Sequence, residues 1–131
     1  MNERLRSGAN VAGRVLMSLI FIAAGAGKIG TFEATQAYMV SFGVPAFLLV
    51  PTIIFELGAG LLLLIGGATR PVAFLLAGFT LVSAAIFHSD FSVPVEQIMF
   101  LKNIAIAGGL LLISANGISG PSVDRWMAKR A

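Results

Sequence analysis

The sequence contains no cysteine, one histidine, one tryptophan and one tyrosine, and only 11% of its 131 residues are charged. The absence of cysteine excludes thiol catalysis, disulfide bonds and cysteine-ligated metal centres. A single histidine excludes a haem held by two protein imidazoles and is too few for a usual metal site, so we expect no bound metal. Soluble domains carry about 25% charged residues, so the low charge argues against a water-soluble enzyme.

Apolar residues take the place of the missing charges. Hydrophobic residues make up 57% of the chain, and the 15 glycines bring the apolar share to about two thirds, against about 45–50% in soluble domains. The mean hydropathy is +0.93. A globule of this size cannot bury so much apolar surface, because a small domain leaves much of its surface exposed. We therefore expect lipid to be the solvent for much of the chain.

Four segments are long and apolar enough to cross a bilayer as helices, which takes about 20 residues each. They are residues 11–29, 47–67, 71–87 and 97–115. The polar–apolar alternation typical of transmembrane barrels is absent. The sequence therefore predicts an all-α membrane protein, a four-transmembrane-helix bundle that forms a single domain over residues 1–131.

The connection over residues 31–45 is longer than a simple turn. Phe32, Met39 and Phe42 fall roughly on one helical face, and Gly43 is well placed to end a helix. We predict a short amphipathic helix at the outer membrane surface, with an irregular loop as the alternative.

The basic residues are divided unevenly between the two sides of the membrane. If the chain crosses four times, one side holds Arg4, Arg6, Arg14, Arg70, Arg125, Lys129 and Arg130. The other side holds only Lys28 and Lys102. Because basic residues favour the cytoplasmic side, we expect both termini to be cytoplasmic, with Arg14 snorkelling to that interface. This bias also explains the high isoelectric point, so we expect no nucleic-acid partner.

Ionisable residues lie at membrane depth in the predicted spans. Glu56 is about 14 Å into the second span and Lys102 about 8 Å from the outer boundary. Lys28 and His88 end the first and third spans on that outer side, and Asn103 follows Lys102. Charges inside lipid cost about 2.5–3.5 kcal/mol each on insertion scales, so such residues suggest a functional site. We expect Glu56 to pair with Lys28 or Lys102.

Two interpretations of this group remain open. It could be a structural ion pair that fixes helix order. It could instead line a polar pocket, open to the outer side, that binds a small polar head group or moves a proton, with Phe32 or Tyr38 as a lid. In the second case the inner half of the bundle is expected to be closed by apolar packing.

Small residues four apart predict close helix contacts, because helices in lipid associate mainly through close backbone approach. The pairs are Ala23 with Gly27, Ala73 with Ala77, and Ala105 with Gly109.

Short motifs follow one another along the chain in a characteristic order. They are Gly13-Arg14, Gly25-Ala26-Gly27-Lys28, Phe42-Gly43-Val44-Pro45, Phe55-Glu56-Leu57-Gly58-Ala59-Gly60, Thr69-Arg70, Phe87-His88, Phe100-Leu101-Lys102-Asn103 and Gly108-Gly109. Together they resemble the DoxX family of small bacterial four-helix membrane proteins, over roughly residues 12–115. Residues 120–124 only approximate the tail of many members, so we assign no function to the tail.

The resemblance implies a multi-pass protein of the bacterial inner membrane. The family is named for a subunit linked to a quinone-reducing thiosulfate oxidoreductase, and similar proteins are associated with redox and electrophile-stress complexes. It therefore implies a redox- or quinone-linked subunit with a membrane or redox partner protein. Without cysteine, electron transfer requires a bound quinone or a partner's cofactor. Quinone carbonyls would accept hydrogen bonds from Lys102 or His88, and Glu56 would relay a proton.

Two other functions remain open at this stage. One is a non-enzymatic scaffold that stabilises a partner complex. The other is a small proton-coupled exporter, although exporters of this size carry their essential glutamate in the first helix, whereas Glu56 lies in the second span. The sequence assigns no catalytic residue and leaves open whether the chain is an enzyme or forms a homo-oligomer.

Overall fold

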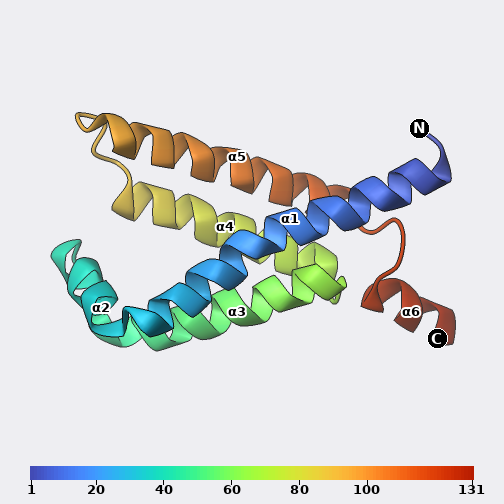
Figure 1. The fold of residues 1–131 in the computed structure, drawn as a ribbon, viewed down its shortest axis with the longest axis horizontal. Coiled ribbons are helices and arrows are strands. Elements are labelled where there is room, and N and C mark those ends of the chain that lie inside the picture. The colour runs from blue at the N-terminus through green and yellow to red at the C-terminus, as the bar shows by residue number, and fades with distance from the viewer.

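A computed structural model describes all 131 residues, and they form helices joined by short loops (Figure 1). The elements are α1 (Glu3–Gly30), α2 (Phe32–Ser41), the short 3-10 helix η1 (Ala46–Leu48), α3 (Leu49–Ile65), α4 (Thr69–Phe87), α5 (Pro94–Asn116) and α6 (Val123–Arg130). Four helical segments are long and apolar enough to cross a membrane, namely α1, η1 with α3, α4, and α5. This confirms the predicted all-α class and its four membrane-spanning helices. Helix α1 begins eight residues before the predicted start of the first span.

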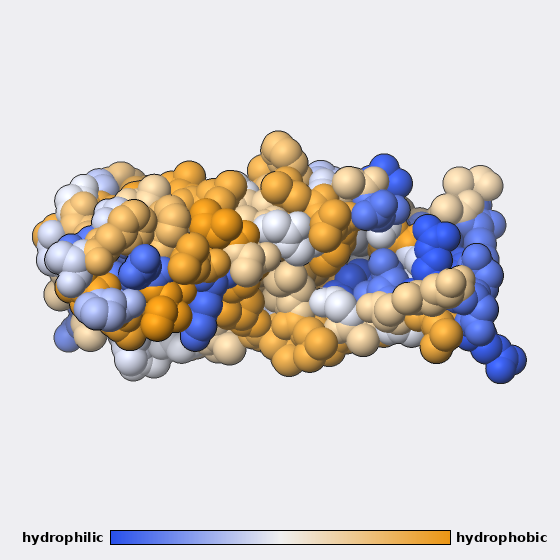
Figure 2. Space-filling view, turned by 90° about the horizontal axis from the view of Figure 1, so that it is seen from above, coloured by the Kyte–Doolittle hydropathy of each residue, from blue (hydrophilic) through white to orange (hydrophobic).

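The bundle has two distinct ends. The terminal end holds both chain termini and the turn between α3 and α4, whereas the α2 end holds α2 and the loop between α4 and α5 (Figure 1). On the face seen in Figure 2, hydrophobic residues cover much of the length and hydrophilic residues gather at the terminal end. This distribution matches helices that span lipid between two polar boundaries.

The helices pack as two pairs. Helix α1 runs along α3 and α4 runs along α5, with fewer contacts between the pairs. The fully buried core residues that join the pairs lie in the half nearer the terminal end, and they include Leu63, Ala73, Leu76 and Leu110. Toward the α2 end the two pairs diverge (Figure 1). The divergence leaves the α2 half of the bundle without a continuous packed core.

Two glycines bring α1 and α3 close together. A Cβ atom on Gly25 would lie 2.8 Å from Cγ of Leu57, and one on Gly60 would lie 3.3 Å from the backbone nitrogen of Ile22. In lipid, apolar side chains gain nothing by moving from lipid to another apolar surface. Helices therefore associate mainly through the close approach of their backbones. The pair α1–α3 therefore depends on small residues facing each other.

The predicted small-residue contacts are correct in part. Ala73 and Ala77 are buried in the core, as predicted. Ala23 and Gly27 are exposed, so that prediction is wrong. The face of α1 that meets α3 contains Gly25, which lies between them in the sequence. In the third pair only Gly109 closely approaches another helix, where it meets the side chain of Met17.

The connection between the first two spans contains the predicted short helix, α2. Only Met39 of this helix is buried, and it packs with Leu49 and Ile53 of α3. Phe42 lies just past the helix end and is exposed, while Gly43 adopts a left-handed conformation with φ of +79°. Helix α6 was not predicted, because its eight residues are too polar and too short to resemble a span.

Candidate functional site

A cavity of about 600 Å³ lies between the two helix pairs, in the half of the bundle nearer the α2 end. Helices α1 to α5 all contribute to its walls, which are mostly apolar. Four of the five predicted pocket residues line it: Lys28, Glu56, His88 and Asn103. Small-molecule sites typically measure about 300–1,000 Å³ and combine apolar walls with a few polar groups, so this cavity has the dimensions of a ligand site.

Glu56 and Lys28 form an ion pair in the cavity wall. Lys28 Nζ lies 2.9 Å from Oε1 and 3.1 Å from Oε2 of Glu56. Glu56 is 2% exposed, while the Lys28 side chain is 28% exposed. Gly25, one turn before Lys28, permits this approach, because its missing Cβ would sit 3.3 Å from Cβ of Glu56. The predicted pairing of Glu56 with a lysine is confirmed, and the partner is Lys28.

Lys102 lies elsewhere. It is exposed on α5 and is not among the residues that line the cavity. Its neighbour Asn103 faces the cavity, and successive residues of a helix are turned about 100° from each other, so the two cannot face the same way. The sequence placed Lys102 in the correct half of the bundle but on the wrong face. The structure therefore removes it from the candidate site.

His88 forms a second polar contact at the cavity, with Glu96. Nδ1 of His88 lies 2.7 Å from Oε2 of Glu96, which joins the end of α4 to the first turn of α5. The other ring nitrogen, Nε2, has no hydrogen-bond partner within the chain. Sequence analysis assigned no role to Glu96, although its place eight residues after His88, across a short loop, was a usable signal.

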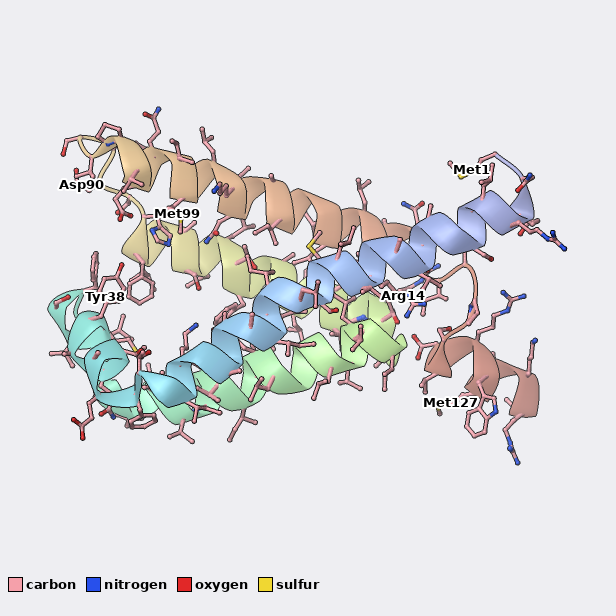
Figure 3. The ribbon with its side chains drawn as sticks, viewed as in Figure 1. Met1, Arg14, Tyr38, Asp90, Met99 and Met127 are labelled. Atoms are coloured by element: carbon pink, nitrogen blue, oxygen red, sulfur yellow. The ribbon has the colours of Figure 1, made fainter.

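Aromatic side chains gather at the α2 end of the cavity. The Tyr38 ring stacks on Phe87 at 5.4 Å between centroids and lies 5.0 Å from Phe42. Burial, and then the negative charge of Glu96, raise the pKa of the Tyr38 hydroxyl above its ordinary value. Figure 3 shows Tyr38 on α2, at the α2 end of the bundle. Of the two proposed lid residues, Tyr38 lines the cavity, whereas Phe32 packs into the apolar cluster beneath α2.

The middle of the cavity holds residues that sequence analysis did not identify. Thr80 and Ser83 of α4 line it together with the Phe55 and Phe79 rings, whose centroids are 5.3 Å apart. Asn103 Nδ2 donates a 3.4 Å hydrogen bond to the Thr80 carbonyl across α4 and α5. The spacing of Thr80, Ser83 and Phe87 along α4 is the helical i, i+3, i+7 pattern of one face, which could have indicated a shared wall.

Part of the cavity wall is also part of the molecular surface. Several of its lining residues are exposed on the outside of the bundle: Ile20 on α1, Leu48 and Pro51 near the start of α3, Val82 and Ile86 on α4, and Met99 on α5. These residues lie in the membrane-spanning segments, so this part of the cavity wall borders the surface that faces lipid.

Comparison with known sequences identifies the family. The sequence model of the DoxX family matches residues 9–89. The chain belongs to the DoxX family. It is 43% identical over 128 residues to the inner membrane protein YqjF of Escherichia coli, covering 98% of each chain. It is also 36% identical over 119 residues to the inner membrane protein YphA of the same organism, covering 86% of this chain and 85% of the relative. No solved structure matches.

In this DoxX-family chain the terminal end carries a polar junction around Arg14 (Figure 3). Arg14 is only 2% exposed, and its guanidinium donates hydrogen bonds to Asn10 Oδ1, the Leu64 carbonyl and the Pro121 carbonyl. The prediction that Arg14 snorkels to the cytoplasmic interface is therefore wrong in that the side chain is buried within the protein. The end of α3 and the segment before α6 fold over it and supply carbonyl acceptors, so it does not need to reach solvent.

Asp124 holds α6 of the DoxX-family chain against the turn between α3 and α4. Its carboxylate accepts hydrogen bonds from the backbone N–H groups of Ala68 and Thr69 at 2.7 and 2.8 Å, at the first turn of α4. Its own N–H donates to the Gly66 carbonyl. Partial burial works to raise the pKa of Asp124, but these hydrogen bonds and the charge of Arg14 outweigh it, and the pKa lies below its ordinary value. Asp124 therefore stays ionised and caps α4.

The terminal half of the bundle is not closed, contrary to prediction. A second cavity of about 290 Å³ lies at the terminal end, with Arg14 in its wall. The apolar residues of the core fill the space between the helix pairs, but the first turns of α1 extend beyond this core. The space between these turns and the end of α5 is the second cavity.

Proposed function

We propose that this DoxX-family membrane protein binds the ring of a membrane quinone in the larger cavity and acts as a redox-linked subunit of a membrane complex. The observation that carries the proposal is the combination of a lipid-accessible cavity with a lysine–glutamate pair in its wall. Ionisable groups at membrane depth are energetically costly, and they commonly mark a ligand or proton pathway.

The walls suit a flat, apolar ring with polar edges. Phe55 and Phe79 in the middle of the cavity and Phe87 and Tyr38 at its α2 end offer stacking surfaces. The exposed lining residues of the membrane-spanning segments would let an isoprenoid tail remain in lipid while the ring enters. A water-soluble substrate would need no wall that borders lipid.

The polar groups match the two carbonyl oxygens of a quinone. Lys28 Nζ is a donor in this cavity and takes the role first assigned to Lys102. The unpartnered Nε2 of His88 donates as well when the imidazole is protonated on both nitrogens, because Nδ1–H already faces the Glu96 carboxylate. Reduction of a quinone to a quinol consumes two electrons and two protons. Because the chain has no cysteine and one histidine, we assign the electrons to a cofactor of a partner protein, and the protons to Glu56 and Glu96 through their basic partners.

Titration with decylubiquinone in detergent tests the proposal. We expect saturable binding by the wild-type chain, measured by isothermal titration calorimetry, and its loss in Ser83→Trp, because the indole fills the middle of the cavity. Leu81→Trp, two residues away on the same helix and outside the lining, is the matched control and should bind like the wild type.

Lys102→Ala provides a second control, since Lys102 is a basic residue in the same half of the bundle that faces outward. It should leave the affinity unchanged. Absence of saturable binding in the wild type, or equal binding by Ser83→Trp, would remove the quinone site. The non-enzymatic scaffold would then be the better account, with the Lys28–Glu56 pair serving only to fix α1 against α3.

The exporter hypothesis loses support from the ion pair. A proton-coupled exporter needs a membrane carboxylate that alternates between a proton and its cargo. Here both oxygens of Glu56 are within hydrogen-bond distance of Lys28, so the carboxylate is not free to bind a cargo directly, although it can still pass a proton through Lys28.

We also propose that the chain resides in the bacterial inner membrane with its terminal end in the cytoplasm. Both relatives are named inner membrane proteins, and the terminal end carries seven of the nine basic residues. A pair of reporters fused after Ala131 tests the orientation. We expect a cytoplasmic reporter such as a fluorescent protein to be active and a periplasmic reporter such as alkaline phosphatase to be inactive; the reverse result would contradict the orientation.

A further inference from the structure

The smaller cavity at the terminal end is strongly basic. It measures about 290 Å³ and lies between the start of α1, the end of α5 and the segment that follows α5. Its polar lining comprises Arg6, Asn10, Arg14, Asn116 and Ser119. No acidic residue lines it. The cavity therefore presents two guanidinium-bearing side chains and neutral donors with no carboxylate to oppose an incoming anion.

The charge of Arg14 is incompletely neutralised. All three of its hydrogen-bond acceptors are neutral oxygens, and no carboxylate lies within salt-bridge distance of it. Asp124 acts on Arg14 only through its charge, because both of its oxygens accept hydrogen bonds from the first turn of α4. A buried guanidinium without a paired anion is costly, and an anionic ligand in the adjoining cavity would lower that cost.

A third guanidinium strengthens the local positive potential. A Cβ atom on Gly117 would lie 2.7 Å from Nε of Arg70, so the Arg70 side chain packs directly against the segment that borders the cavity. Gly117 itself lines the cavity and has a φ of +70°, a conformation that glycine adopts without strain. The glycine thus allows the segment to run tightly between Arg70 and the cavity.

The position of this cavity selects a lipid head group over a soluble ligand. Helix α1 has 28 residues and is about 42 Å long, whereas the hydrocarbon core of a bilayer is about 30 Å thick. Because Arg6 and Asn10 lie in the first turns of α1, we place the excess length at the terminal end, in the head-group region. The wall also includes Leu112, which is 65% exposed on the membrane-facing side of α5 and can contact an acyl chain.

From this geometry we propose that the terminal-end cavity binds the phosphate of an anionic phospholipid such as phosphatidylglycerol. Arg6 contacts the phosphate, Arg14 attracts it by its charge from the cavity wall, Asn116 and Ser119 contact the glycerol, and the acyl chains lie along Leu112. Basic pockets between transmembrane helices on the cytoplasmic side are suited to such head groups. This site is separate from the larger cavity, and the proposal does not depend on quinone binding.

The test uses delipidated, full-length protein in a neutral detergent, titrated with dioctanoyl-phosphatidylglycerol and followed by native mass spectrometry. We expect one saturable site, with Arg6→Gln weakening the affinity about fivefold, the loss typical of one basic residue near an anionic surface. Arg4→Gln is the matched control, since Arg4 lies on the same helix, carries the same charge and does not line the cavity. Its affinity should change less than twofold. Arg14→Gln is unsuitable as the only variant, because it also breaks contacts of the fold.

Two further ligands distinguish the sources of the phosphate. Dioctanoyl-phosphatidylcholine should bind at least tenfold more weakly, because its choline places a positive charge beside the arginines. Inorganic phosphate should also bind more weakly, because it lacks acyl chains to contact Leu112. Equal affinity for inorganic phosphate or phosphatidylcholine would overturn the proposal, as would equal weakening by Arg4→Gln and Arg6→Gln, which would indicate unspecific attraction.

Discussion

Replacing Lys28 by methionine is expected to destabilise the folded bundle by about 3–5 kcal/mol, the usual cost of removing one partner from a buried ion pair. The substitution leaves the Glu56 carboxylate, which is 2% exposed, without the ammonium group that lies 2.9 Å away. The free energy of unfolding can be measured by titrating the protein from mild detergent into dodecyl sulfate and following helicity by circular dichroism. Lys102→Met removes the same charge from an exposed position and should cost much less.

Replacing Glu56 instead of Lys28 shows how much each member of the ion pair contributes to stability. Glu56→Gln should destabilise less than Lys28→Met, because the Lys28 side chain is 28% exposed and can turn toward the polar boundary of the membrane. The double variant should be more stable than Lys28→Met alone, since it leaves no unpaired charge. Equal effects of Lys28→Met and Lys102→Met would show that the pair does not stabilise the bundle.

Replacing Arg14 by methionine is expected to cost about 3–5 kcal/mol and to loosen α6. Hydrogen bonds from a charged group contribute roughly 1.5–3 kcal/mol each, and Arg14 donates to the Leu64 and Pro121 carbonyls, which join the end of α3 to the segment before α6. The chain has a single tryptophan, Trp126, and it lies on α6. Fluorescence anisotropy of Trp126 should therefore fall in the variant.

The exposed Arg4 supplies the control for this change. Arg4→Met removes a charge from the same helix without breaking a hydrogen bond, and it should leave both the unfolding free energy and the anisotropy of Trp126 close to the wild-type values. If Arg14→Met unfolds like Arg4→Met with unchanged anisotropy, Arg14 does not hold the terminal end together.

The spans and the depth of the polar residues could be predicted from the sequence, because both follow from the position of a residue along an apolar helix. The predicted pairing of Glu56 with a lysine is correct for this reason. The face of each helix could not be predicted, because transmembrane helices are apolar on all sides and give no hydrophobic pattern that marks the inside. Lys102 and Asn103 differ by one position, yet only Asn103 lines the cavity.

The terminal end was the part least predictable from the sequence. Arg14 is buried because residues more than 100 positions later fold over it. Asp124 meets the start of α4 because the irregular segment before α6 brings the first turn of α6 to that place. Such contacts depend on where the chain turns after α5. Neither composition nor helical periodicity contains that information, whereas the short helix α2 was predictable from local signals such as Gly43.

The quinone content of the protein extracted from its own membrane tests the central proposal most directly. The chain would be isolated with its surrounding lipids in polymer nanodiscs, and quinone and phospholipid would be quantified by mass spectrometry. We expect about one quinone per chain, well above the bulk quinone-to-phospholipid ratio, falling to that ratio in Ser83→Trp but not in Leu81→Trp. A wild-type quinone content equal to that of the bulk membrane would contradict the proposal.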